Sequence, residues 1–89
     1  YKAALVAFEN FTRDYPDSDI NEEIRFLQIE AAYLLARQSI TTKQKERYQK
    51  AVDLYLAYID RYEGSKFIKN AEDYYSNSIE ALAKLRTNN

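Results

Sequence analysis

Cysteine and histidine are both absent from the 89-residue sequence. Their absence excludes disulfides, thiol chemistry, the usual nucleophile–base pairs and the common zinc sites. The 14 acidic residues make carboxylate pairs unavoidable, so such pairs do not mark a catalytic site. We therefore expect no enzymatic activity and no cofactor, and the chain is predicted to act by binding other proteins.

Glycine and proline occur once each, whereas an all-β fold needs many such residues for its turns. No apolar run is long enough to cross a bilayer. The net charge of −1 offers no attraction to nucleic acid or to an anionic membrane. Hydrophobic residues make up 46% of the chain and charged residues 30%, a balance typical of globular proteins. The sequence thus predicts an all-α protein.

Apolar residues recur at spacings of three and four, which predicts four helices at about residues 1–15, 19–38, 43–62 and 66–85. Pro16 ends the first helix, and Ser18 is the expected N-cap of the second. Thr41 with Gln44 fits a capping box for the third helix. Gly64 tolerates the left-handed conformation that commonly follows a helix end. Few, short connections therefore join the predicted helices.

A shift of 47 positions brings the apolar pattern of the chain onto itself, which indicates an internal repeat. The matched pairs are Tyr1/Tyr48, Ala4/Ala51, Leu5/Val52, Phe8/Tyr55, Phe11/Tyr58, Tyr15/Tyr62 and Ser18/Ser65. The matched alanines let a neighbouring helix approach closely, and the large aromatics fill the groove beside them. Each helical hairpin then leaves an apolar face that the next hairpin covers.

The repeat residues resemble a known pattern at Ala32-Tyr33, Tyr48, Ala51, Tyr55, Tyr58 and the turn 62–65. They look like a tetratricopeptide repeat, which implies helical hairpins stacked into a right-handed superhelix. Within one domain, 1–89, the resemblance implies the B helix of a truncated repeat at 1–15, one complete repeat at 19–62 and a C-terminal helix at 66–86. Because the usual repeat has about 34 residues, the resemblance implies a hairpin loop lengthened by roughly a dozen residues around the polar stretch 37–47, with the connection between the helices near residues 38–42.

Six segments carry a narrower resemblance: 1–11 (YKAALVAFENF), 15–18 (YPDS), 46–51 (ERYQKA), 58–62 (YIDRY), 65–67 (SKF) and 69–72 (KNAE). They resemble the BamD family of outer-membrane β-barrel assembly lipoproteins, in the form found in Bacteroidetes-like bacteria. The resemblance implies a scaffold at the periplasmic face of the outer membrane, in a lipid-anchored parent chain, that holds the barrel-forming subunit. Two features depart from the family: Glu63-Gly64 stands where Pro-Asp or Pro-Glu is common, and the lipid-bearing cysteine is absent.

The alternative interpretation is a generic tetratricopeptide-type adaptor in another cell-envelope or cytoplasmic complex. Tyr1 opens directly within a helical pattern, so we expect the chain to be cut from a longer one. The first helix then lacks a partner helix, and its partly bare apolar stripe favours dimerisation of the fragment.

The predicted recognition residues form a basic run that would meet an acidic partner: Arg37, Lys43, Lys45, Arg47 and Lys50. The competing interpretation is a solvated loop and helix start. Four tyrosines are expected in the core, with their hydroxyls at its edge: Tyr1, Tyr48, Tyr55 and Tyr62. Tyr74 and Tyr75 are adjacent and cannot share one helix face. One of them, taken as Tyr75, is therefore predicted to face solvent or a partner.

Overall fold

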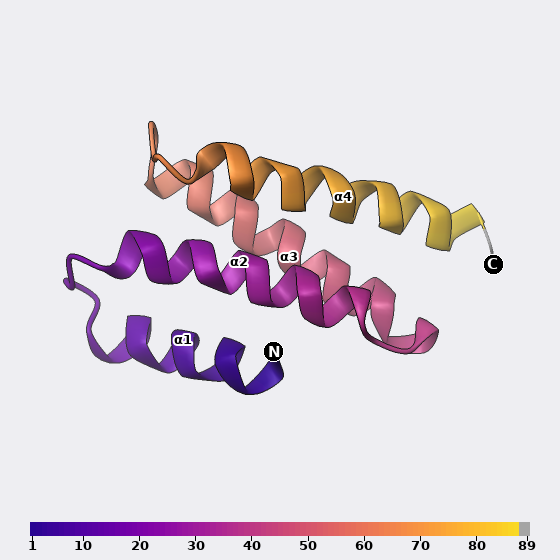
Figure 1. Ribbon diagram of the computed structural model, residues 1–89, viewed down its shortest axis with the longest axis horizontal. Helices are drawn as coiled ribbons and strands as arrows, with labels where there is room; N and C mark the ends of the chain where they lie inside the picture. Colours follow the sequence, from indigo (N-terminus) through magenta and orange to yellow (C-terminus); the bar gives the residue numbers. More distant parts are fainter. Residues whose placement is uncertain (88–89) are drawn as a thin grey trace.

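The computed structural model describes residues 1–87; residues 88 and 89 of the predicted domain lie outside the described part of the chain. Within residues 1–87 the protein is all-α, as predicted, and contains no strand. Its helices are α1 (Lys2–Asp14), α2 (Asn21–Arg37), α3 (Thr41–Arg61) and α4 (Ile68–Thr87) (Figure 1). They pack into a bundle measuring 43 × 27 × 15 Å along its principal axes. None of these helices combines the length and apolar character needed to cross a bilayer.

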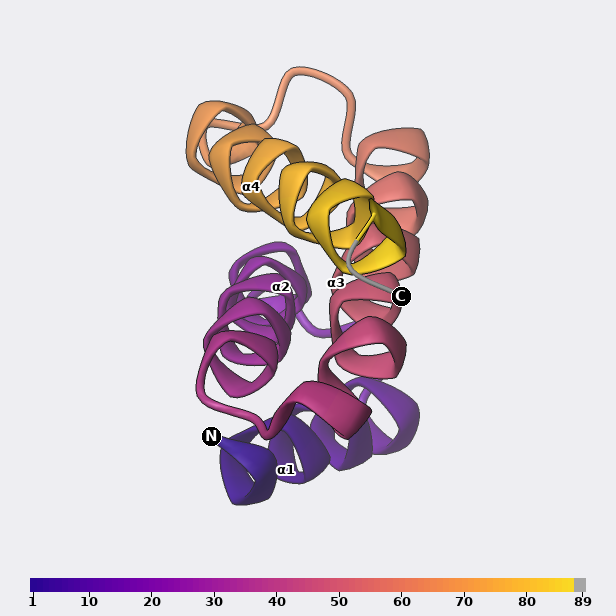
Figure 2. The same ribbon diagram turned by 90° about the vertical axis from the view of Figure 1, so that its right-hand side faces the viewer.

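Helix α2 has neighbours on several sides. Seen from the end of the bundle, α2 and α3 lie side by side, with α1 below them and α4 above (Figure 2). Helix α4 packs against both α2 and α3. Helix α1 packs against α2 and reaches α3 through an ion pair between Glu9 and Lys50. Helix α2 therefore packs against α1, α3 and α4.

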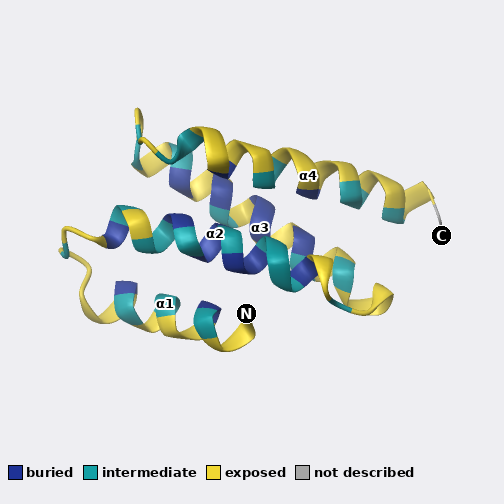
Figure 3. Ribbon diagram, in the orientation of Figure 1, coloured by how far each residue is buried: buried dark blue, intermediate teal, exposed yellow. Residues whose placement is uncertain are grey.

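Two groups of buried side chains hold the helices together. The first joins α2, α3 and α4 and consists of Phe26, Ile29, Tyr55, Tyr58 and Ala71. The second joins α1, α2 and α3 and consists of Leu5, Ala31, Ala32 and Ala51. Figure 3 shows the buried residues on the inner sides of α2 and α3, with long exposed faces on α1 and α4. Ala51 is fully buried, so a small side chain does stand where α3 meets α2, as the repeat pattern predicts.

The α1–α2 and α3–α4 turns make the same backbone hydrogen bonds at an offset of 47 residues. In the first turn the N–H groups donate as follows: Tyr15 to Phe11 O (2.8 Å), Ser18 to Tyr15 O (3.1 Å) and Asn21 to Ser18 O (3.2 Å). The matching bonds run from Tyr62 to Tyr58 O (2.9 Å), Ser65 to Tyr62 O (3.1 Å) and Ile68 to Ser65 O (3.1 Å). Phe11–Tyr15 and Tyr58–Tyr62 are also matched, since both pairs have ring centroids 5.1 Å apart. One turn structure is thus formed twice.

The helix starts differ from the predicted caps. Helix α2 begins at Asn21 with Ile20 as N-cap, because a further turn at residues 19–20 follows Ser18. The Ser18 hydroxyl accepts a long hydrogen bond of 3.4 Å from the Ile20 N–H within that turn, so Ser18 precedes the helix by three residues. Ser65 occupies the equivalent place before α4: its hydroxyl accepts a shorter hydrogen bond of 3.1 Å from the Phe67 N–H, and the helix begins three residues later at Ile68.

The predicted capping box at the start of α3 is wrong. The N-cap is Ile40, which makes no side-chain cap. Gln44 turns back instead, and its amide donates to the carbonyl of Ala36 at 3.2 Å. It is therefore a second donor to a carbonyl at the end of α2, which also accepts from the Ser39 N–H at 3.2 Å.

The long loop predicted at 37–47 is also wrong. The connection consists of residues 38–40, and residues 41–47 form the first two turns of α3. Lys, Gln, Glu and Arg are good helix formers even when exposed, and this segment has no Gly or Pro to stop them. The extra residues of the 47-residue spacing therefore lengthen the helices, which reach 17 residues in α2 and 21 in α3.

Candidate protein-binding surfaces

Three of the predicted basic residues are held by neighbours within the protein. The Arg37 guanidinium lies 5.6 Å from the centre of the Tyr33 ring. Arg47 donates to the Ser39 hydroxyl at 2.6 Å, and that hydroxyl donates to the carbonyl of Leu35. Lys50 pairs with Glu9 of α1 at 3.4 Å, an exposed pair that contributes little to stability.

Lys43 and Lys45 are exposed, and the structure gives them no ion pair within residues 1–87. They are spaced by two residues on α3, so they point to different sides of the helix. Lys45 lies beside Arg86 at a hollow between α3 and α4 that is also lined by Gln49, Ile79 and Leu82. The predicted basic run is therefore divided among several surfaces.

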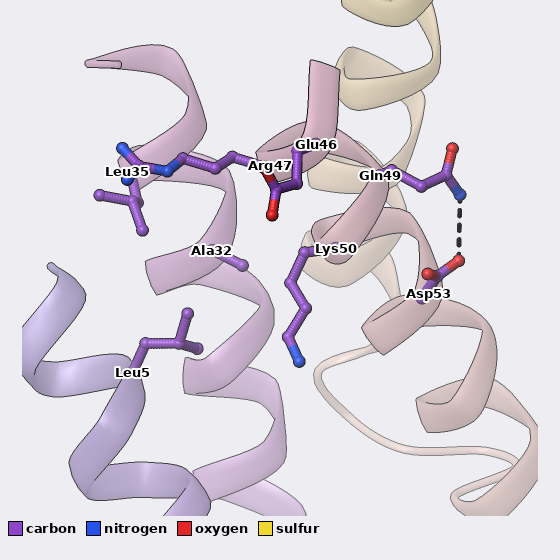
Figure 4. Close-up of a pocket in the computed structure, with 8 residues that line it drawn as sticks. All are labelled: Leu5, Ala32, Leu35, Glu46, Arg47, Gln49, Lys50 and Asp53. Atoms are coloured by element: carbon purple, nitrogen blue, oxygen red, sulfur yellow. Dashed lines mark hydrogen bonds between the residues drawn. The ribbon is translucent and has the colours of Figure 1, made fainter. Parts of the chain in front are cut away.

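A groove that was not predicted from the sequence lies between α1, α2 and α3. Its apolar floor is formed by Leu5, Ala32 and Leu35, and its volume is about 410 Å³. Polar side chains of α3 line its other side: Glu46, Arg47, Gln49, Lys50 and Asp53. Figure 4 shows Lys50 reaching across the groove towards α1, while Gln49 and Asp53 bond to each other at the outer edge. Such a site suits an apolar side chain of a partner flanked by charges of both signs.

Tyr74 and Tyr75 both pack against the core, so the prediction that one of them faces away from it is wrong. Because α4 contacts two helices, its adjacent side chains meet different neighbours. The Tyr74 ring lies 5.2 Å from that of Tyr33 on α2, and the Tyr75 ring stacks on Tyr55 of α3 at 4.5 Å. Both rings are half-buried. A role for the exposed edge of Tyr75 in partner binding stays a prediction.

Of the four tyrosines predicted in the core, three are buried or half-buried and one is exposed. Tyr48 and Tyr55 are buried, as predicted, and Tyr62 is half-buried against the α2–α3–α4 core. The prediction that Tyr1 lies in the core is wrong, since 53% of this residue is exposed. Burial is the main reason why the pKa values of Tyr48 and Tyr55 are raised above the usual range.

A chain of hydroxyl groups links α2 to the α3–α4 turn. Ser65 donates to a carboxylate oxygen of Glu22 at 2.8 Å. Since that bond uses its single proton, the bond of 2.5 Å between Tyr58 and Ser65 must be donated by Tyr58. Burial raises the pKa of the Tyr58 hydroxyl, which favours the protonated form that this bond requires. The sequence indicated Ser65 because it matches Ser18 at the 47-residue offset. Nothing in the sequence indicated Glu22, which lies 43 residues away.

A second long-range bond joins α4 to α2. The Tyr74 hydroxyl donates to a carboxylate oxygen of Glu30 at 2.6 Å. This hydrogen bond is the largest cause, followed by burial, of a pKa raised to about 12 for Tyr74. The bond exists while the tyrosine is protonated, so it fixes α4 on α2 at all but strongly alkaline pH.

No group of three or more acidic side chains that could hold a metal ion occurs in the described part of the chain, which has neither His nor Cys. The candidate features of the described residues are surfaces that a partner could contact and hydrogen bonds between helices. The sequence matches no model of a known protein family and no curated protein.

Proposed function

We propose that the protein is a binding scaffold made of tetratricopeptide-type helical hairpins, stacked as a right-handed superhelix. The observation that carries this proposal is the turn formed twice, with the same backbone bonds and the same aromatic pair 47 residues apart. Helices α1 and α2 would belong to successive repeats, as would α3 and α4. A stack of this kind presents extended surfaces to other proteins, which is how such scaffolds act.

We further propose that the parent chain is a BamD-type lipoprotein at the periplasmic face of the outer membrane. It would help to insert β-barrel proteins by holding the barrel-forming subunit. The support is the sequence resemblance. The segments at 15–18 and 65–67 fall in the two matching turns, while 46–51 lies on α3 and 58–62 covers the end of α3 and its C-cap Tyr62. Shared residues at these positions maintain the fold on which a partner surface is built.

A generic adaptor in another cell-envelope or cytoplasmic complex is the second candidate. The observation in its favour is that the resembling residues include core positions such as Tyr48, Ala51 and Tyr58. Packing residues of this kind are shared by repeat proteins that bind unrelated partners.

Copurification separates the two candidates. The full parent chain would be tagged, extracted from membranes in mild detergent, and its partners identified. Recovery of an outer-membrane barrel protein with periplasmic domains supports the assembly scaffold. Recovery of soluble partners alone contradicts the assembly function and supports the adaptor.

Charge reversal tests whether the basic residues recognise that partner. The predicted basic run includes Lys43, Lys45 and Arg47, but Arg47 also bonds to Ser39 and its replacement would disturb the hairpin. The double variant Lys43→Glu/Lys45→Glu is therefore the cleaner test, with Lys69→Glu, an exposed lysine on α4, as the matched control. Loss of partner recovery in the double variant alone supports the hypothesis, whereas unchanged recovery rejects it.

A further inference from the structure

A hollow between α2 and α3 carries positive charge that the protein does not neutralise itself. Arg25 of α2 and Arg61 of α3 both line this hollow, whose volume is about 420 Å³. Neither arginine takes part in an ion pair within residues 1–87. The two helices that form the hollow lie side by side in the middle of the bundle, with α1 below and α4 above (Figure 2). Two unpaired guanidinium groups thus share one hollow.

Arg25 is the more deeply placed of the two arginines. The residue is half-buried, and its Nε is shielded from water without a hydrogen-bond partner within residues 1–87. The Oδ1 of Asn21, one turn earlier on α2, also lacks a partner. A bond from Nε to that oxygen would still leave the other N–H groups of the guanidinium free. Because part of the water around Arg25 is already removed, an anion that reaches it gains more than at a fully exposed arginine.

The hollow also has an amide and an apolar surface. Gln28 of α2 lines it and is 3% exposed. Its amide makes none of the side-chain hydrogen bonds found within residues 1–87, so it is able to donate to a carboxylate oxygen. Leu54 and Ala57 of α3 supply the apolar part of the lining. The hollow therefore suits a ligand with an aliphatic stem and a negatively charged head.

An acidic residue, Asp60, lines the same hollow and limits the negative charge that it accepts. Asp60 is exposed and makes no ion pair within the described residues. Two arginines and one aspartate give the lining a net charge of +1. One carboxylate neutralises this charge, whereas a phosphoryl group carries a charge of about −1.5 to −2 at pH 7 and would be repelled by Asp60. Charge complementarity thus favours a carboxylate over a phosphate.

We propose that this hollow binds the carboxylate of a glutamate side chain on a partner protein. Arg25 and Arg61 hold the carboxylate oxygens, and Leu54 packs against the aliphatic stem, which is longer in glutamate than in aspartate. This inference rests on the proposed scaffold for the source of the carboxylate and adds the chemistry of one contact. The hollow is separate from the basic run 37–50, since neither of its arginines belongs to that run.

A pair of small probes tests the proposal. N-acetylglutamate α-amide presents the side chain, and N-acetylglutamine α-amide is its uncharged counterpart. Each is added to the 89-residue chain while the backbone amide signals are followed by NMR. We expect saturable shifts around the hollow on α2 and α3 with the glutamate probe, at a Kd of about 1–10 mM, and none with the glutamine probe. Saturable binding of both probes, or of neither, overturns the proposal.

Arg61→Gln is the decisive variant, because Arg61 is exposed and lies outside both groups of buried side chains. The loss of one charged hydrogen bond should raise the Kd of the glutamate probe about tenfold. The matched control is Arg86→Gln, which changes an exposed arginine on α4 and should leave the Kd unchanged. An unchanged Kd in Arg61→Gln overturns the proposal, as does an equal rise in both variants, which would indicate attraction to positive charge in general.

Asp60→Asn tests the selection of a carboxylate. Inorganic phosphate should bind the unchanged protein about fivefold more weakly than the glutamate probe, and Asp60→Asn should strengthen phosphate binding. Phosphate that binds the unchanged protein as tightly as the glutamate probe overturns the assignment in favour of a general anion site. Unchanged phosphate affinity in Asp60→Asn overturns the role given to Asp60. Copurification tests the scaffold separately, since failure to recover a partner would leave these probe measurements unaffected.

Discussion

Ser65 provides the sharpest test of how the turns hold the bundle. Ser65→Ala removes three hydrogen bonds, with Glu22 at 2.8 Å, Tyr58 at 2.5 Å and the Phe67 N–H at 3.1 Å. A lost capping bond costs about 1 kcal/mol, and an unpaired buried hydroxyl such as that of Tyr58 costs about 1–3 kcal/mol. Because Ser65 and Glu22 are half-buried, water replaces part of the carboxylate bond. We expect the free energy of unfolding to fall by about 2–3 kcal/mol.

The matched control is Ser18→Ala at the equivalent position of the first turn. Its one comparable bond, from the Ile20 N–H, is 3.4 Å long, and Phe11 offers no hydroxyl. We expect a loss of about 0.5 kcal/mol or less. Urea unfolding followed by circular dichroism compares the two variants. With an unfolding free energy that falls by about 1.5 kcal/mol per M of urea, the Ser65→Ala midpoint should lie about 1–2 M below that of the unchanged protein.

The reasoning fails if the two alanine variants lose the same stability. A double-mutant cycle of Ser65→Ala with Tyr58→Phe adds a second criterion, because groups in one hydrogen-bond chain are not additive. A coupling energy near zero would mean that the hydroxyl chain does not act as a unit. A coupling of about 1 kcal/mol supports it.

Three further predictions use the same unfolding measurements. The folded state favours the neutral form of Tyr74, so the contribution of this tyrosine to stability is complete below pH 10 and is lost as pH rises towards about 12. Tyr74→Phe should flatten this alkaline loss of stability, and an unchanged loss would contradict the prediction. Ala51→Leu should cost about 1–3 kcal/mol at the crowded α2–α3 contact, whereas Ala4→Leu should cost under about 0.5 kcal/mol because Ala4 is only half-buried; equal costs would contradict this difference in packing. Gly64→Ala should cost about 1 kcal/mol through its φ of +75° alone, since an added Cβ meets no atom within 4 Å, and Gly64→Asn should cost less.

The helices and the buried positions of α3 were predictable because both follow from local periodicity. A stripe at spacings of three and four places Tyr48, Ala51 and Tyr58 on one side of a helix before any partner is known. The same stripe on α1 predicted Tyr1 in the core, where it is 53% exposed. Periodicity identifies the face that can be buried, and the neighbour that buries it lies elsewhere in the chain.

Helix starts and the binding surfaces were less predictable because they depend on contacts between segments. Gln44 fits a capping box by spacing, yet its amide finds a carbonyl of the preceding helix eight residues back. The basic run reads as one cluster in the sequence, but Arg47 and Lys50 bond to Ser39 and Glu9. The groove over Leu5, Ala32 and Leu35 comes from three helices and has no sequence signal of its own.

The two segments whose turns match at an offset of 47 residues act as internal controls for each other. Where both segments keep a residue type and its role, as with Ser18 and Ser65 in the turns, that residue maintains the shared structure. Where two matching positions carry different side chains, the difference reflects what each side chain packs against. Tyr58 has a hydroxyl and joins the chain that ends at Glu22, while Phe11 has none. Ile29 is buried against α3, whereas Ser76 faces water. Such differences follow from the neighbours of each helix, because the backbone of the turn itself is the same in both places.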